Sequence, residues 1–162
     1  MKRTLIAILM ALALVLIPVG SALAATSAEV TVTATPGFVS ITNLPNSFDF
    51  GVVTGGSTPN TTTGWFTITN ASTVAMDVNI KCTAWTSWTY GAPAEDQGQL
   101  KASDGDGAYD VTIVAINTDY LLMSAVGVGV DPTWELQLDA PTSFTNVDVQ
   151  TTTVTITAVV TP

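Results

Sequence analysis

The sequence of 162 residues contains no histidine, one cysteine and only 4 lysine and arginine residues. Without histidine it lacks the commonest general base, the base of Ser-His-Asp and Cys-His arrangements, and the usual zinc ligand. Because Cys82 is the only cysteine, no disulfide can form within the chain. A domain of this size can bury an adequate core without one. Paired carboxylates remain as candidate catalysts. The acidic residues concerned all lie in one loop-like stretch, whereas this chemistry requires a rigid pocket; they are Glu95, Asp96, Asp104, Asp106 and Asp110. We therefore expect a protein that is not an enzyme.

The N-terminus predicts a secretory signal peptide over residues 1–24. Two basic residues precede an apolar run over 5–17, and Ala22 and Ala24 provide the small side chains that signal peptidase requires. The run is shorter than the roughly 20 apolar residues of a membrane span. We expect a mature chain that begins at Ala25, is secreted or held at the cell surface, and has no membrane span.

The mature chain is strongly acidic. Once the signal peptide is removed, only Lys81 and Lys101 oppose 13 acidic residues, a net charge of −11. Such a surface repels a phosphate backbone, so we expect no nucleic-acid partner. The charge also favours solubility and could attract cations or basic partners.

Threonine, valine and alternating polarity predict strands almost throughout the mature chain. The clearest stripe places Met76, Val78, Ile80 and Cys82 on one face, which also predicts that Cys82 is a buried core thiol. The polar, glycine-rich stretch 91–108 is predicted to be a surface loop. The predicted strands are 29–35, 38–42, 48–53, 65–70, 76–84, 109–116, 121–130, 134–138 and 153–160.

About nine short strands separated by turn signals, with no helix, predict an all-β fold. The pattern favours a single antiparallel β-sandwich of immunoglobulin-like type. A closed barrel is the alternative. No linker divides residues 25–162, so we expect one domain.

Two stretches resemble extracellular β-sandwich proteins. Phe48-Asp49-Phe50-Gly51-Val52-Val53 followed by Phe66-Thr67-Ile68-Thr69-Asn70 resembles a strand pair of bacterial and archaeal immunoglobulin-like surface domains. Trp134-Glu135-Leu136 resembles the motif of the WxL surface domain, whose family binds peptidoglycan, although the second Trp-x-Leu of that family is missing here. The resemblance implies a surface location and a sandwich fold.

Two constellations are candidate binding sites. Asp104, Asp106 and Asp110 alternate with glycines, a pattern that can wrap Ca²⁺; a solvated Asp-Gly turn is the alternative. A second cluster contains Trp85, Trp88 and Tyr90. Exposed aromatic rings of this kind stack on sugars, whereas buried ones would simply cover the core.

The two ends of the mature chain suggest a role in assembly. Residues 30–34 and 154–158 are both threonine-rich and strand-like, and exposed sheet edges pair with other chains. We expect a structural or interaction protein of the cell surface, such as a fibre, surface-layer or adhesin-like subunit, that pairs with itself or other surface proteins. The alternative is a glycan- or cell-wall-binding module that uses the tryptophans, including Trp134.

Overall fold

The computed structural model describes residues 31–162. The predicted signal peptide, the cleavage before Ala25 and the first two residues of the predicted strand 29–35 lie outside the described residues. Residues 31–35 form no strand and are exposed, so the structure contradicts that strand for the residues it describes. Residues 36–162 form a compact unit of their own, which contains every strand of the structure.

The described chain contains nine strands and no helix, which confirms the all-β prediction. The strands are β1 (Ile41–Leu44), β2 (Phe66–Asn70), β3 (Met76–Cys82), β4 (Thr89–Tyr90), β5 (Gln97–Ser103), β6 (Val111–Thr112), β7 (Tyr120–Val126), β8 (Thr133–Asp139) and β9 (Val154–Val160).

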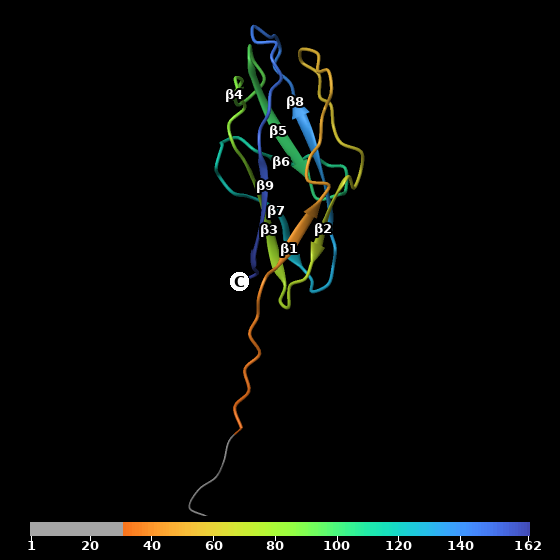
Figure 1. Cartoon of the computed structure of the whole chain (residues 1–162), viewed down its shortest axis with the longest axis vertical. Coiled ribbons are helices and arrows are strands. Elements are labelled where there is room, and N and C mark those ends of the chain that lie inside the picture. The colour runs from red at the N-terminus through yellow and green to blue at the C-terminus, as the bar shows by residue number, and fades with distance from the viewer. Residues whose placement is uncertain (1–30) are drawn as a thin grey trace, which may run out of the picture. The chain divides into compact units, whose positions relative to one another are not determined.

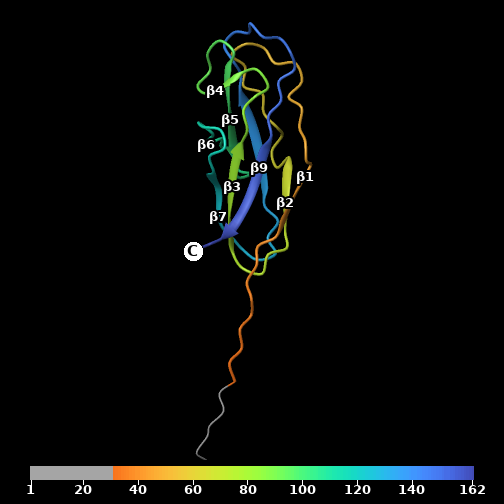
Figure 2. The same cartoon turned by 60° about the vertical axis from the view of Figure 1, so that its left-hand side comes forward.

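The strands form two sheets (Figure 1). The larger has the order β1-β2-β8-β5-β4, with β6 also pairing with β5, and the smaller has the order β7-β3-β9. In Figure 2, β9 crosses the front of the unit, with β3 and β7 on one side of it and β1 and β2 on the other. The sandwich is not purely antiparallel, because β4 pairs with β5 in parallel.

Alternating side chains from both sheets make the core. Every second residue of β3 is buried, from Met76 to Cys82, and its register sets Ile80 opposite Ile156 of β9. From the larger sheet, Ile68 of β2 and Trp134 of β8 are buried in the same core. Alternation along strands such as β2 and β3 gives each sheet an apolar face, and the two faces are buried against each other.

The predicted strand 48–53 is a loop. Gly51 has φ +68°, and its backbone N–H donates a 2.8 Å hydrogen bond to Asp49 Oδ1, so a turn interrupts the run. Phe48 packs edge-on against Phe50 and Trp65, with ring centroids 4.9 and 5.3 Å away. The strand pair of the immunoglobulin-like resemblance therefore does not form, and β2 pairs with β1 and β8 instead.

The predicted surface loop 91–108 contains β5, a strand with neighbours on both sides in the larger sheet. Its inward residues are Gly98, Leu100 and Ala102, all buried, and two of these are too small to produce a clear apolar stripe. Gly98 leaves room for the neighbouring chain, since a Cβ there would lie 3.0 Å from the carbonyl oxygen of Asp139. Pairing with β8 makes this segment a strand.

Candidate functional site

A largely apolar cleft of about 1120 Å³ is lined by strands of both sheets, including the edge strands β1 and β9, and by the loop residues 45–53 and 146–153, among which are Asp49 and Asp148. Six strands face three, so the smaller sheet covers only part of the inner face of the larger. The cleft walls include Phe66 and Trp134 from the larger sheet and Val154 and Ile156 from β9. The sequence gives no direct sign of this cleft, because side-chain alternation does not show which strands are neighbours.

Trp134 anchors the wall formed by the larger sheet. It is 2% exposed and stacks on Phe66 with ring centroids 4.2 Å apart and planes at 19°. Its Nε1 donates a 2.7 Å hydrogen bond to Oδ1 of Asn43. Trp134 therefore serves as a core residue. It is not exposed, so it adds no support to the resemblance between the Trp-Glu-Leu motif and wall-binding domains.

The opposite wall, β9, is an unprotected sheet edge. Among residues 31–162 its only strand partner is β3, with which it pairs over all seven residues without a register shift. The strand VTITAVV contains no charge and no proline, the features that usually protect an edge from pairing with other chains. Its core-facing side chains, Val154, Ile156 and Ala158, are only partly buried.

The predicted glycan-binding aromatics form one cluster at the end of the cleft. Trp85 is 9% exposed; its ring lies 5.8 Å from that of Trp88 and is nearly parallel to that of Tyr90 at 6.2 Å. Trp88 stacks on Phe144 at 5.4 Å. The structure thus brings the three residues together, but their ring faces pack largely against other aromatic rings. Glycan binding by this cluster stays a prediction.

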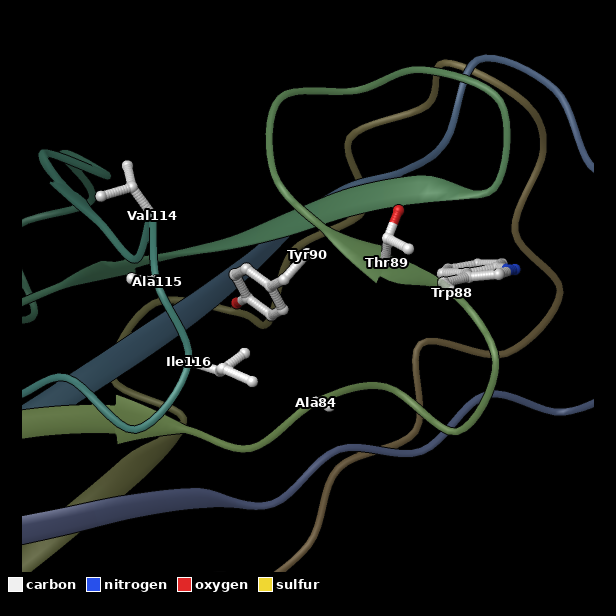
Figure 3. Close-up of a pocket in the computed structure, with 7 residues that line it drawn as sticks. All are labelled: Ala84, Trp88, Thr89, Tyr90, Val114, Ala115 and Ile116. Carbon is white, nitrogen blue, oxygen red and sulfur yellow. The ribbon is translucent and has the colours of Figure 1, made fainter.

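Both indole nitrogens of this cluster are buried without a hydrogen-bond partner among the described residues, namely Nε1 of Trp85 and Nε1 of Trp88. Both tryptophans line the cleft. In Figure 3 the nitrogen of Trp88 points away from Tyr90. A buried N–H without an acceptor is costly.

A second, smaller hollow of about 430 Å³ lies on the other side of Tyr90 (Figure 3). The Tyr90 ring faces Ile116 there, and its hydroxyl accepts a 2.8 Å hydrogen bond from the Leu100 backbone N–H.

Cys82 is 1% exposed, which confirms the predicted core thiol. Burial raises the pKa of Cys82 above its ordinary value of 9.0, although a hydrogen bond with Tyr90 partly offsets this. Burial likewise raises the pKa of Tyr90.

The Asp-Gly turn does not present three carboxylates to one point. Asp106 Oδ1 accepts hydrogen bonds from the Ala108 backbone N–H at 2.7 Å and from the Ser103 hydroxyl at 3.1 Å. Asp104 and Asp110 are exposed. Within residues 31–162, no three acidic, cysteine or histidine side chains lie close enough together to hold a metal ion. Calcium binding by the three aspartates stays a prediction, which a melting-temperature titration with Ca²⁺ tests.

Sequence reasoning missed the burial of Glu135. The alternation of β8 places it on the face away from the cleft, where a solvated side chain is expected, yet it is 0% exposed. Its Oε1 accepts a 2.7 Å hydrogen bond from the Gly64 backbone N–H, and its Oε2 is buried without a partner among the described residues. The loop that precedes β2 covers this face, since Asn60 bridges to Gln137 and Gly64 bonds to Glu135, and this contact is a feature of the fold that the sequence does not show.

Both lysines of residues 31–162 form ion pairs. Lys81 Nζ lies 3.3 Å from Asp119 Oδ1, and Lys101 Nζ lies 2.8 Å from Asp139 Oδ2. The remaining carboxylates give the surface its acidic character.

No protein family, curated protein or solved structure matches the chain. Across residues 31–162, there is no helix of the length and hydropathy that a membrane crossing requires. The function must therefore be argued from the cleft and the strand edges themselves.

Proposed function

We propose that this protein is a non-catalytic structural subunit, secreted or held at the cell surface, that assembles through its sheet edges with itself or with other surface proteins. The observation that carries the proposal is the uncharged edge of β9 beside an unfilled apolar cleft. An open edge offers unpaired backbone groups to another chain, and the cleft beside it adds apolar surface that a partner can bury.

Export is part of the proposal and rests on the sequence of residues 1–24, a basic start, an apolar run and small residues before the expected cut. We also propose that the sandwich is a variant of the immunoglobulin-like arrangement. Two packed sheets support this variant, and the parallel β4–β5 pair is a departure from it.

The glycan-binding alternative has less geometric support. Sugar recognition by aromatic residues needs a free ring face, whereas Trp85 and Tyr90 lie nearly parallel to each other and Trp88 stacks on Phe144. A polysaccharide pull-down with the mature protein that retains it on a glycan resin, and a loss of retention in Trp88→Ala, would favour this alternative instead.

The proposal is tested by the size of the mature protein in solution. Residues 25–162 are purified and examined by size-exclusion chromatography with light scattering and by negative-stain microscopy. We expect species much larger than a monomer, in amounts that rise with protein concentration. A protein that stays monomeric up to the limit of its solubility would contradict self-assembly. Assembly with other surface proteins would then be the part of the proposal left to test.

A further inference from the structure

We propose that the cleft between β1 and β9 receives residues 29–35 of a second copy of this chain, as an added strand beside β9. The proposal rests on the proposed function, because it names the partner of the same open edge. It makes residues 29–35 the donor and the cleft the acceptor, so that each copy both gives and receives a strand.

The donor segment matches the acceptor edge in length and pattern. Residues 29–35 read EVTVTAT, seven residues, and β9 is a strand of seven residues that reads VTITAVV. In the donor, Val30, Val32 and Ala34 share one face and the intervening threonines share the other. An added strand of this pattern continues the apolar face of β9 over the cleft and leaves its threonines toward water.

Residues 31–35, the described part of the donor segment, have no strand role within their own chain. Residues 31–35 form no strand and their side chains are exposed. A segment rich in threonine and valine has a strong preference for a sheet, and this preference is unmet in the single chain. An edge that accepts such a segment supplies the missing hydrogen bonds.

Chain connectivity favours a second copy over the same copy. Phe38 and Ser40 are already bound to the loop between β2 and β3, since their carbonyl oxygens accept 3.0 Å hydrogen bonds from the backbone N–H groups of Thr73 and Ala71. Only Pro36 and Gly37 would then connect this bound segment to a strand beside β9. The three-residue step from residue 35 to residue 38 spans at most about 11 Å when fully extended.

That connection would also have to reverse the chain direction. Gly37 lies against Val74, since a Cβ at Gly37 would be 2.6 Å from Val74 Cγ1, and the next carbonyl, that of Ala75, accepts a 3.1 Å hydrogen bond from Thr161 N–H just beyond β9. The chain therefore enters the larger sheet beside the C-terminal end of β9. A strand beside its own β9 would have to turn back there within Pro36 and Gly37 before the chain continues into β1. A strand donated by a second copy needs no such turn.

Two tryptophans mark the end of the cleft at which the added strand would meet the start of β9. Trp85 Nε1 and Trp88 Nε1 are buried without partners among the described residues, and both residues line the cleft. They lie where β9 begins, because Thr83 and Thr86 donate backbone hydrogen bonds to the carbonyl oxygens of Thr153 and Thr151.

The first experiment compares two variants of residues 25–162. Val32→Asp places a charge on the donor face that enters the cleft, and Thr33→Asp places the same charge on the opposite face as the matched control. Neither alters a strand of the folded unit, so the monomeric V32D should melt at the same temperature as residues 36–162 without the donor segment. We expect V32D to be monomeric under conditions in which wild type and T33D assemble.

The second experiment measures the contact directly. A peptide of residues 25–35, which contains no aromatic residue, is titrated into residues 36–162, the unit that contains both sheets, while tryptophan fluorescence is recorded. Because Trp85, Trp88 and Trp134 line the cleft, we expect a saturable spectral shift at one peptide per protein. The V32D peptide should bind at least about 100-fold more weakly, since it buries an unpaired charge, and the T33D peptide should bind nearly as well as wild type.

The outcomes separate the two proposals. Assembly of wild type that persists in V32D, with no peptide binding, would overturn the donor-strand inference while leaving the structural function standing. A wild-type monomer that binds no peptide would overturn both. A wild-type monomer whose 36–162 fragment binds the peptide would show that the segment occupies its own cleft, which overturns the exchange between copies.

Discussion

The indole Nε1 of Trp134 donates a 2.7 Å hydrogen bond to Asn43 Oδ1 across 91 residues of sequence. This bond connects β8, in the interior of the larger sheet, to β1 at its edge. It satisfies the polar group of a ring that otherwise lies in an apolar environment, stacked on Phe66, and it fixes the position of the edge strand beside the cleft.

Asn43→Ala should therefore destabilise the fold. The substitution leaves the Trp134 N–H without its acceptor, and we expect a loss of about 1–2 kcal/mol in the free energy of unfolding, measured by urea denaturation. Asn46→Ala is the control, because Asn46 is exposed in the adjoining loop. Equal stabilities for the two variants would show that the bond contributes nothing.

Gly105→Ala should destabilise the fold more than Gly107→Ala. Both glycines have positive φ, +97° and +81°, but a Cβ at Gly105 would lie 2.7 Å from Thr133 Oγ1 and 2.9 Å from the Thr133 carbonyl oxygen, whereas nothing lies within 4 Å of one at Gly107. We expect a cost of about 2–4 kcal/mol for G105A and about 1–2 kcal/mol for G107A. Thermal denaturation monitored by circular dichroism measures both, and the reverse order would contradict the close contact with β8.

Asp96 should make stability depend on pH in the acidic range. Its carboxylate accepts hydrogen bonds from the Thr145 hydroxyl, the Thr145 backbone N–H at 2.9 Å and the Asn146 backbone N–H at 3.2 Å. The Thr145 hydroxyl contributes most to lowering the pKa of Asp96 below its ordinary 3.8. A lowered pKa stabilises the fold above the ordinary value, and this contribution is lost as pH falls through the folded-state pKa.

The measurement is the melting temperature of Asp96→Asn relative to wild type at pH 7 and below pH 3. Asparagine tolerates the positive φ of 49° at this position, so the variant isolates the charge. We expect wild type to melt higher at pH 7 and the difference to shrink at low pH. A pH-independent difference for D96N would rule out the carboxylate as its cause.

The Cys82 thiol should be inert in the folded protein. Because burial both blocks access and raises its pKa above 9.0, we expect alkylation by iodoacetamide at pH 8 to be at least about 100-fold slower than in 8 M urea. Because the pKa of Cys82 is raised in the folded protein, the thiol's contribution to stability is complete below the pKa of the unfolded state. This contribution declines as pH rises above that unfolded-state pKa. Rapid labelling of native protein would contradict the buried position.

Some elements could be predicted because their own residues identify them. The strict alternation from Met76 to Cys82 predicts β3 and the burial of its thiol, and the Thr-Val repeat near the C-terminus predicts β9. The alternation of side chains between the two faces of a strand depends only on that strand's own residues, whichever strand lies beside it. For this reason the expected all-β class and most of the core agree with the structure.

Other elements depended on contacts that sequence patterns do not contain. The segment 48–53 has β-forming residues but forms a turn at Asp49 and Gly51, where a side chain satisfies the backbone. The segment Gln97–Ser103 has few large apolar residues but is a strand because β8 pairs with it. In both cases tertiary context overrides local propensity. The same limit applies to the glycan prediction, since nothing in the order Trp85, Trp88 and Tyr90 shows that their rings pack together.

The sequence by itself determined that this chain forms strands, which side chains of several strands turn inward, and that the protein is acidic and has no histidine chemistry. Only the tertiary structure decided which strands are neighbours, that β9 is an edge, and that an apolar cleft stays open beside it. The physical reason is that alternation assigns a side chain to a face, whereas an edge exists only through the absence of a neighbour, which is a relation between segments far apart in the chain.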